Sequence, residues 1–85
     1  MRLDKYLKVS RIIKRRTVAN EACDNGRVTV NGRVAKAGAI IKVGDEVTIT
    51  FGDKVFAFRV LSVNETAKKD EASSMFEVLT DQIIK

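Results

Sequence analysis

The apolar positions at the start of the chain follow the period of an α-helix. Counted from Leu3, the positions at i, i+3, i+4 and i+7 are Leu3, Tyr6, Leu7 and Ser10, and the helix is expected over residues 2–9. This spacing predicts a two-turn helix. Asp4 and Lys8 fall on the opposite face, where their i, i+4 spacing favours an ion pair. Because so short a helix is not stable alone, we expect it to dock on the rest of the domain.

A second helix is expected after a basic connector that spans residues 11–16. Ile12 and Ile13 interrupt the charges of this connector and are expected to anchor it in the core. The helix is predicted over residues 16–25, and Gly26 follows it as a left-handed C-cap, because glycine has no Cβ to clash there. The apolar stripe of this helix consists of Val18, Ala19, Ala22 and Cys23.

The start of this second helix lacks the usual capping residue. Lys14, Arg15 and Arg16 crowd the end at which the helix dipole disfavours cations. An anion such as a phosphate would relieve this conflict, because it can meet both the N–H groups of the first turn and the arginines. Thr17 is interpreted as a cap for this helix rather than as an RNA contact.

From Val28 onward the pattern changes to the alternation of apolar and polar residues that is typical of strands. Asn-Gly at residues 31–32 predicts a hairpin with a two-residue type I′ turn. Two further turns are expected at residues 42–46 and 52–53, and the polar residues 64–74 are expected to form a surface loop or a poorly ordered helix. The expected strands span residues 28–30, 33–35, 47–51, 55–63 and 75–79, followed by a tail at 81–85.

These elements predict an α+β fold, with two short helices followed by a small antiparallel sheet. Tyr6 and Cys23 occupy apolar helical positions and are expected in the core. The same holds for the four phenylalanines, which are Phe51, Phe56, Phe58 and Phe76. The sheet is therefore not interpreted as an aromatic platform on which single-stranded bases stack.

Length and composition place the chain among small folded domains. A chain of 85 residues forms one domain with little room for a catalytic cleft, so no enzyme is expected. No apolar run approaches the roughly 18–20 residues of a membrane span, and no secretory signal is visible. One cysteine and no histidine exclude an intrachain disulfide and a zinc site. We therefore expect a cytoplasmic protein without metal or cofactor.

Charge is divided unevenly along the chain. Residues 1–36 hold ten Lys/Arg and three acidic residues, a net +7, whereas residues 37–85 hold six and eight, a net −2. This contrast indicates a surface that faces nucleic acid rather than an ordinary solvated one. The candidate RNA-binding residues are Arg2, Lys5, Lys8, Arg11, Lys14, Arg15, Arg16, Arg27 and Arg33.

Four parts of the chain together resemble the S4 RNA-binding domain. They are RLDKYL at residues 2–7, Arg16, GRVTVNGR at residues 26–33 and GDEV at residues 44–47. The resemblance implies an α-L motif of two helices and a curved small sheet over residues 1–63, with residues 64–85 packed on the same domain. It also implies that Arg16, ten residues before the glycine of the second motif, contacts RNA.

Among stand-alone S4 proteins, the chain resembles the RqcP proteins of bacterial ribosome-associated quality control. The connector KVSRIIKRRT and the ending EASSMFEVL carry this resemblance, and the basic C-terminal extension of the related fifteen-kilodalton heat-shock protein is absent. The resemblance implies binding to rRNA and peptidyl-tRNA on obstructed large ribosomal subunits, with RqcH as partner during untemplated alanine addition. Nothing in the sequence suggests a dimer, so a monomer is expected.

Three other functions compete with this interpretation. A heat-shock-type recycling factor would act on the same subunit and share the same chemistry. An RNA-modifying enzyme such as a pseudouridine synthase needs a large catalytic domain, for which this chain has no room. A DNA-binding protein would be recognised by competition between duplex DNA and rRNA.

Overall fold

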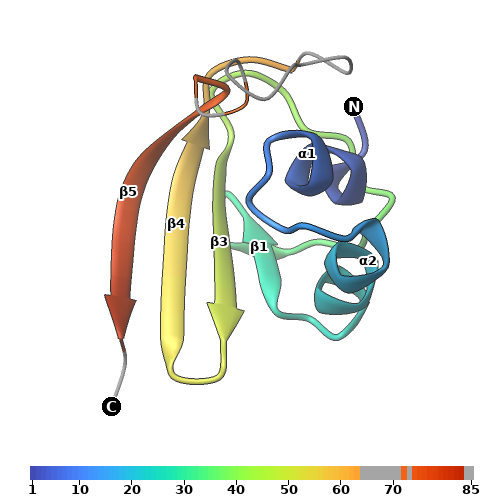
Figure 1. The fold of residues 1–85 in the computed structure, drawn as a ribbon, viewed down its shortest axis with the longest axis vertical. Coiled ribbons are helices and arrows are strands. Elements are labelled where there is room, and N and C mark those ends of the chain that lie inside the picture. Colours follow the sequence, from blue (N-terminus) through green and yellow to red (C-terminus); the bar gives the residue numbers. More distant parts are fainter. Residues whose placement is uncertain (64–71, 73, 84–85) are drawn as a thin grey trace.

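Two helices lie against one face of a five-stranded sheet in the computed structural model, which describes residues 1–63, 72 and 74–83 (Figure 1). The helices are α1 (Leu3–Val9) and α2 (Arg16–Asp24). The strands are β1 (Val28–Val30), β2 (Arg33–Val34), β3 (Glu46–Phe51), β4 (Lys54–Val60) and β5 (Phe76–Ile83). This arrangement confirms the predicted α+β class. No helix in the described part of the chain is long and apolar enough to cross a membrane.

The strand order is β2-β1-β3-β4-β5, and every neighbouring pair is antiparallel. Because β3 pairs with β1 rather than with β2, residues 35–45 run back from the sheet edge before β3 begins. On this path they meet the start of α1. The Leu3 N–H donates to the Ala39 carbonyl at 2.8 Å, and the Asp4 N–H donates to the Ala37 carbonyl at 3.2 Å. The connection therefore holds α1 in place.

Residues with positive φ mark the turns between these elements. Asn31 and Gly32 have φ of 52° and 84°, which confirms the predicted type I′ turn. Gly26 has φ of 76° and its N–H donates to the Cys23 carbonyl, so the predicted C-cap of α2 is confirmed. Arg11, which follows α1, has φ of 62°, a conformation that costs a residue other than glycine about 1–2 kcal/mol.

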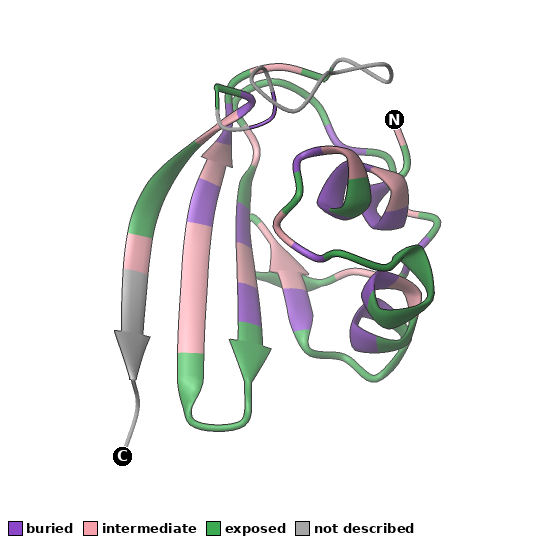
Figure 2. Cartoon of the chain, viewed as in Figure 1, coloured by how far each residue is buried: buried purple, intermediate pink, exposed green. Residues whose placement is uncertain are grey.

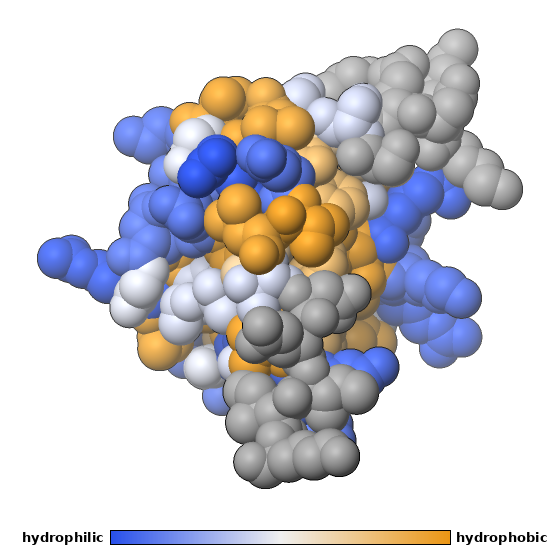
Figure 3. All heavy atoms as spheres, turned by 90° about the vertical axis from the view of Figure 1, so that its left-hand side faces the viewer, coloured by the Kyte–Doolittle hydropathy of each residue, from blue (hydrophilic) through white to orange (hydrophobic). Residues whose placement is uncertain are grey.

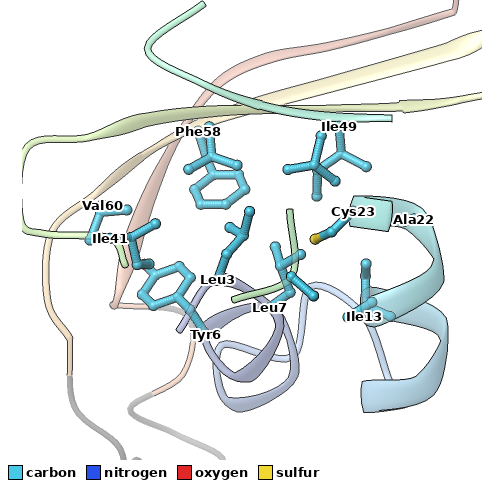
Figure 4. Packing of buried hydrophobic residues seen from close by; sticks show 14 of the residues in the cluster. Leu3, Tyr6, Leu7, Ile13, Ala22, Cys23, Ile41, Ile49, Phe58 and Val60 are labelled. Carbon is cyan, nitrogen blue, oxygen red and sulfur yellow. The ribbon is translucent and has the colours of Figure 1, made fainter. Parts of the chain in front are cut away.

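The core fills the space between the helices and the sheet (Figure 2). At its centre the rings of Tyr6 and Phe58 stack with centroids 6.0 Å apart, and Cys23 of α2 points into the core near Leu7 (Figure 4). The Tyr6 hydroxyl donates to the Met75 carbonyl at 2.6 Å, which joins α1 to the residue before β5. Other buried core residues are Leu3, Leu7, Ile13, Val28, Ile41, Val47, Ile49 and Val60. The core roles predicted for Tyr6, Cys23 and Phe58 are confirmed.

Two side chains expected in the core lie at the surface instead. Val18 is 43% exposed, because α2 turns Ala19 and Cys23 toward the core and Val18 lies about 100° around the helix from Ala19. Phe51 is 36% exposed at the end of β3. Phe56 is half-buried and packs against the core cluster without being enclosed by it, and the same is true of Phe76 of β5.

The last two strands differ from their predicted bounds. The expected strand over residues 55–63 ends at Val60. The final strand continues to Ile83, so the tail predicted from residue 81 is wrong for residues 81–83. The final strand is longer than predicted because it pairs with β4 along the whole length of β4. The pairing is interrupted by a bulge between Ala57 and Phe58 and continues from Ala57 with Thr80 to the end of β5. Most of the loop predicted at residues 64–74 lies outside the described residues.

Candidate RNA-binding surface

The start of α1 and the start of α2 meet at a buried carboxylate. Asp4 has a side chain only 2% exposed. Arg2 Nε lies 3.2 Å from Asp4 Oδ1, and Arg16 Nε lies 3.3 Å from Asp4 Oδ2. Asn20 Nδ2 donates to Oδ2 at 3.4 Å, and the Lys5 N–H donates to Oδ1 at 2.8 Å. One carboxylate therefore links two helices and two guanidinium groups.

Two predictions about Asp4 are wrong. It lies in the interior rather than on a polar face, and it pairs with Arg2 and Arg16 rather than with Lys8. Burial alone would raise the pKa of Asp4, but hydrogen bonds from Asn20, Arg16 and a backbone N–H, with the charge of Arg16, outweigh burial and hold this pKa below its ordinary value. Asp4 is therefore ionised at neutral pH, and the carboxylate with its two arginines carries a net charge of +1.

Both arginines stay half-exposed although they contact a buried group. The side chain of Arg2 is 50% exposed and that of Arg16 is 49% exposed. Arg16 bonds Asp4 through Nε, and within the described part of the chain its two Nη nitrogens have no protein partner. A guanidinium carries five N–H donors in a planar fork. Each arginine can therefore hold Asp4 with one edge and present donors to a phosphate with another.

Seven of the nine candidate residues lie between the start of α1 and the first residue of α2. Besides Arg2 and Arg16, they are Lys5, Lys8, Arg11, Lys14 and Arg15, of which Lys5 is half-buried and the others are exposed. Arg27 instead follows the far end of α2, a helix of nine residues that is about 14 Å long and begins at Arg16. Arg33 opens β2. The structure thus brings Arg2 and Arg16 together and leaves Arg27 and Arg33 outside their cluster.

The first turn of α2 has no side-chain cap. Arg15 is the N-cap residue, with φ of −120° and ψ of 131°, and its side chain makes no capping hydrogen bond. The expectation that Thr17 caps this helix is wrong, because Thr17 already lies within the first turn. The N–H groups of this turn and the neighbouring Arg15 and Arg16 together favour an anion.

Other polar side chains near this surface have structural partners. Lys36 Nζ donates to the Asp24 carbonyl at 3.1 Å and so stabilises the C-terminal end of α2. Asn31 Nδ2 donates to Asp45 Oδ1 at 3.1 Å, and the Glu46 N–H donates to Asn31 Oδ1 at 3.0 Å. These contacts hold the hairpin turn against the start of β3.

The sequence pattern did not indicate Asp4 and Asn20 as parts of this surface. No spacing rule within one helix connects Asn20 with Asp4, because the two residues meet only when α2 packs on α1. The one available signal was the position of Asp4 in the RLDKYL motif, directly between an arginine and the apolar face of α1.

The one cysteine of the chain is a packing residue. Burial, with smaller contributions from the charges of Asp4 and Asp24, raises the pKa of the Cys23 thiol to about 11. The thiol is therefore neutral at pH 7 and a poor nucleophile. The described residues contain no pocket and no group of three or more potential metal ligands.

The opposite end of the molecule has a different surface. Viewed from the β5 side, hydrophobic side chains gather over the sheet edge with hydrophilic ones beside them (Figure 3). Val78 is 51% exposed and Leu79 38% exposed. One exposed ion pair, Arg59 with Glu77 at 3.3 Å, joins β4 to β5. Such an exposed pair contributes little to stability.

Known proteins show the same combination of fold and sequence. The S4 domain family matches residues 1–47. The RQC P-site tRNA stabilizing factor of Halalkalibacterium halodurans is 56% identical over 84 residues, which cover 99% of this chain and 96% of that protein. The factor of the same name from Bacillus subtilis is 50% identical over 82 residues, which cover 96% of this chain and 95% of that protein.

The fold also has a solved counterpart. The trimeric structure of heat shock protein 15 from Vibrio cholerae superposes with a TM-score of 0.84 at 25% identity, and the match covers 93% of this chain and 81% of that one. These findings confirm the resemblance to the S4 domain and to the RqcP proteins. The chain belongs to the S4 domain family and, within it, to the RQC P-site tRNA stabilizing factors.

Proposed function

We propose that this protein is a non-enzymatic factor that binds rRNA and tRNA on large ribosomal subunits obstructed by peptidyl-tRNA. There it supports untemplated alanine addition together with an RqcH-type factor. The observation that carries the proposal is the pair of half-exposed arginines, Arg2 and Arg16, that share one buried carboxylate in the basic half of the chain. The name of its relatives, RQC P-site tRNA stabilizing factor, supports the tRNA contact.

This surface suits structured RNA. Such RNA is recognised largely through shape, phosphates and 2′-hydroxyls, and planar guanidinium groups bind phosphate in a bidentate way. Each neutralised phosphate contributes about −0.7 to −0.9 to the slope of log K against log salt concentration. With three to six contacts we expect a slope of about −2 to −5. An affinity for large subunits that did not change with salt would contradict this mechanism.

Substitution of Arg16 tests the proposal directly. We expect Arg16→Ala to abolish co-sedimentation with obstructed large subunits, while thermal unfolding stays within a few degrees of wild type. Arg59→Ala is the matched control, because it removes an equal charge from β4, where Arg59 forms an exposed ion pair. A folded Arg16→Ala variant that co-sediments like wild type would remove Arg16 from the site.

A second candidate is a recycling factor of the heat-shock type, and the similarity of fold to heat shock protein 15 favours it. Affinity purification of the tagged protein from cells separates the two functions. Recovery of RqcH and alanine-tailed chains supports the quality-control role, whereas recovery of large subunits with untailed nascent chains supports recycling. In either role the protein acts in the cytoplasm, and we expect a monomer, which sedimentation of the free protein tests.

A further inference from the structure

We propose that Asp4 is a positioning residue for RNA binding, which orients the guanidinium groups of Arg2 and Arg16 so that their outward donors meet the same stretch of RNA backbone. This inference rests on the proposed function and adds an acidic residue to a basic surface. Asp4 itself is too buried to touch RNA, so it acts through the two arginines.

Apart from the two arginines, Asp4 makes hydrogen bonds to groups on α1, on α2 and on the connection between β2 and β3. Its own backbone N–H donates to the Ala37 carbonyl, and its Oδ1 accepts the N–H of Lys5. Asn20 of α2 donates to Oδ2 from the neighbouring helix. These contacts leave Asp4 little freedom of rotation, so it is a rigid anchor for flexible side chains.

The two arginines use different edges of their guanidinium groups. Arg2 approaches Asp4 with Nε and Nη2, which lie 3.2 Å from Oδ1 and 3.4 Å from Oδ2, so that Nη1 takes no part in this pair. Arg16 approaches with Nε alone, and neither of its Nη nitrogens contacts the described part of the protein. Both arginines therefore keep N–H donors for a phosphate while Asp4 holds them close to each other. Binding then costs less side-chain entropy than it would with two freely rotating arginines.

Simple electrostatics predicts the opposite effect for Asp4. A negative charge on a basic surface should weaken binding to RNA, so its removal should strengthen binding. The positioning role predicts that removal of the Asp4 charge weakens binding. The affinity gained from one more net positive charge is smaller than the affinity lost when the guanidinium groups of Arg2 and Arg16 are no longer oriented. The sign of the effect therefore decides between the two.

The test compares Asp4→Asn with Glu21→Gln in binding to purified large ribosomal subunits. Both variants remove one negative charge, and Glu21 is an exposed residue of α2 outside the Asp4 cluster. We expect Asp4→Asn to weaken binding about tenfold, the effect of one weakened charge-assisted contact, and Glu21→Gln to leave it unchanged or slightly tighter. Equal or tighter binding by folded Asp4→Asn would overturn the inference.

A double-mutant cycle separates positioning from a general structural role. If Asp4 acts through the arginines, the effect of Asp4→Asn should fall to about threefold in an Arg16→Lys background, which keeps measurable binding and leaves Arg2 as the one arginine that Asp4 orients. An undiminished loss in that background would show that Asp4 only supports the fold. The salt slope adds a readout that a structural role does not move: it should become shallower by about one contact in Asp4→Asn.

A second variant keeps the inference testable if Asp4→Asn does not fold. Arg16→Lys retains the charge, but an ammonium bound to Asp4 has no second edge for a phosphate. We expect Arg16→Lys to lose several times more affinity than Arg15→Lys, whose arginine does not contact Asp4. Equal losses from the two substitutions would overturn the inference.

The state of the free protein distinguishes failure of this inference from failure of the proposed function. NMR of the arginine Nε–H groups needs no RNA. We expect separate, slowly exchanging signals for Arg2 and Arg16 that merge with those of exposed arginines in Asp4→Asn, or in Asp4→Ala as a second choice. Averaged signals in wild type would overturn the inference. Separate signals with no subunit binding would preserve the anchor and refute the proposed function.

Discussion

The two ends of this small domain differ in how their surface side chains are held. At the helix end, Arg2 and Arg16 are anchored by contacts that converge on the buried Asp4. At the β5 end, the surface carries exposed apolar side chains and an ion pair between two exposed groups, Arg59 and Glu77. The helix end carries more positive charge, but each end presents arginine, so the way in which arginine is held can be compared between them. What differs is whether a buried partner orients the arginine.

In this chain of 85 residues, the aromatic cluster provides a rigid support and the helix end carries the charged groups for binding. The aromatic cluster that joins the two ends gives rigidity: Phe58 stacks on Tyr6 and meets Phe76 edge to face, with centroids 5.6 Å apart. The helix end then places its charged groups on this support. A binding surface built on a rigid scaffold loses less entropy when it meets its partner.

The largest expected effect is a loss of stability when the aromatic packing between the two ends is broken. Phe58→Ala should lower the free energy of unfolding by about 3–5 kcal/mol, because it removes a fully buried ring and leaves a cavity. Phe51→Ala is the matched control, and we expect it to cost under about 1 kcal/mol, because Phe51 is exposed at the end of β3. Urea unfolding measures both. Similar losses for the two variants would contradict the burial of Phe58 and the exposure of Phe51.

The next effect compares equal charges at the two ends. Lys14→Ala with Arg15→Ala should weaken binding to large subunits about tenfold and make the salt slope shallower by about 1.5, because two phosphate contacts are lost. Lys54→Ala with Arg59→Ala removes the same charge from β4, and we expect a change of about twofold or less. Filter binding across a salt series measures both. Equal effects would mean that net charge, not placement, governs binding.

A smaller effect is expected at the strained residue between the helices. Arg11→Gly should leave the free energy of unfolding unchanged or raise it by up to about 1 kcal/mol, because relief of the positive φ offsets the extra chain entropy of glycine. If Arg11 contacts RNA, the same variant should bind subunits more weakly. Thermal unfolding and co-sedimentation test the two statements. A marked loss of stability would show that the Arg11 side chain itself supports the fold.

The smallest expected effect is the change at low pH in the stability contributed by Asp4. The pKa of Asp4 is lowered in the folded state, so its ionised form stabilises the protein above the ordinary aspartate pKa of about 4, and this contribution is lost as pH falls below that value. The difference in stability between wild type and Asp4→Asn should therefore be constant from pH 7 to about 5 and shrink below about 4. Chemical unfolding at a series of pH values measures it. A difference that grew in acid would contradict the lowered pKa.

Local patterns in the sequence predicted one helix, one hairpin turn and the family. The spacing of Leu3, Tyr6 and Leu7 predicted α1, and Asn31-Gly32 predicted the hairpin turn, because both depend on backbone preferences within a few residues. The motifs that identify the S4 domain are also short and continuous. The sequence by itself thus determined the α+β class, the basic half and the family.

Only the tertiary structure decided how the basic residues are used. Asp4 has the same local pattern as an exposed acid, and it became an anchor because residues 35–45 and α2 pack around it. Likewise Phe51 alternates like a core residue, yet the end of β3 leaves it exposed. Burial and ion pairing depend on neighbours that are distant in the sequence, and no local period records them.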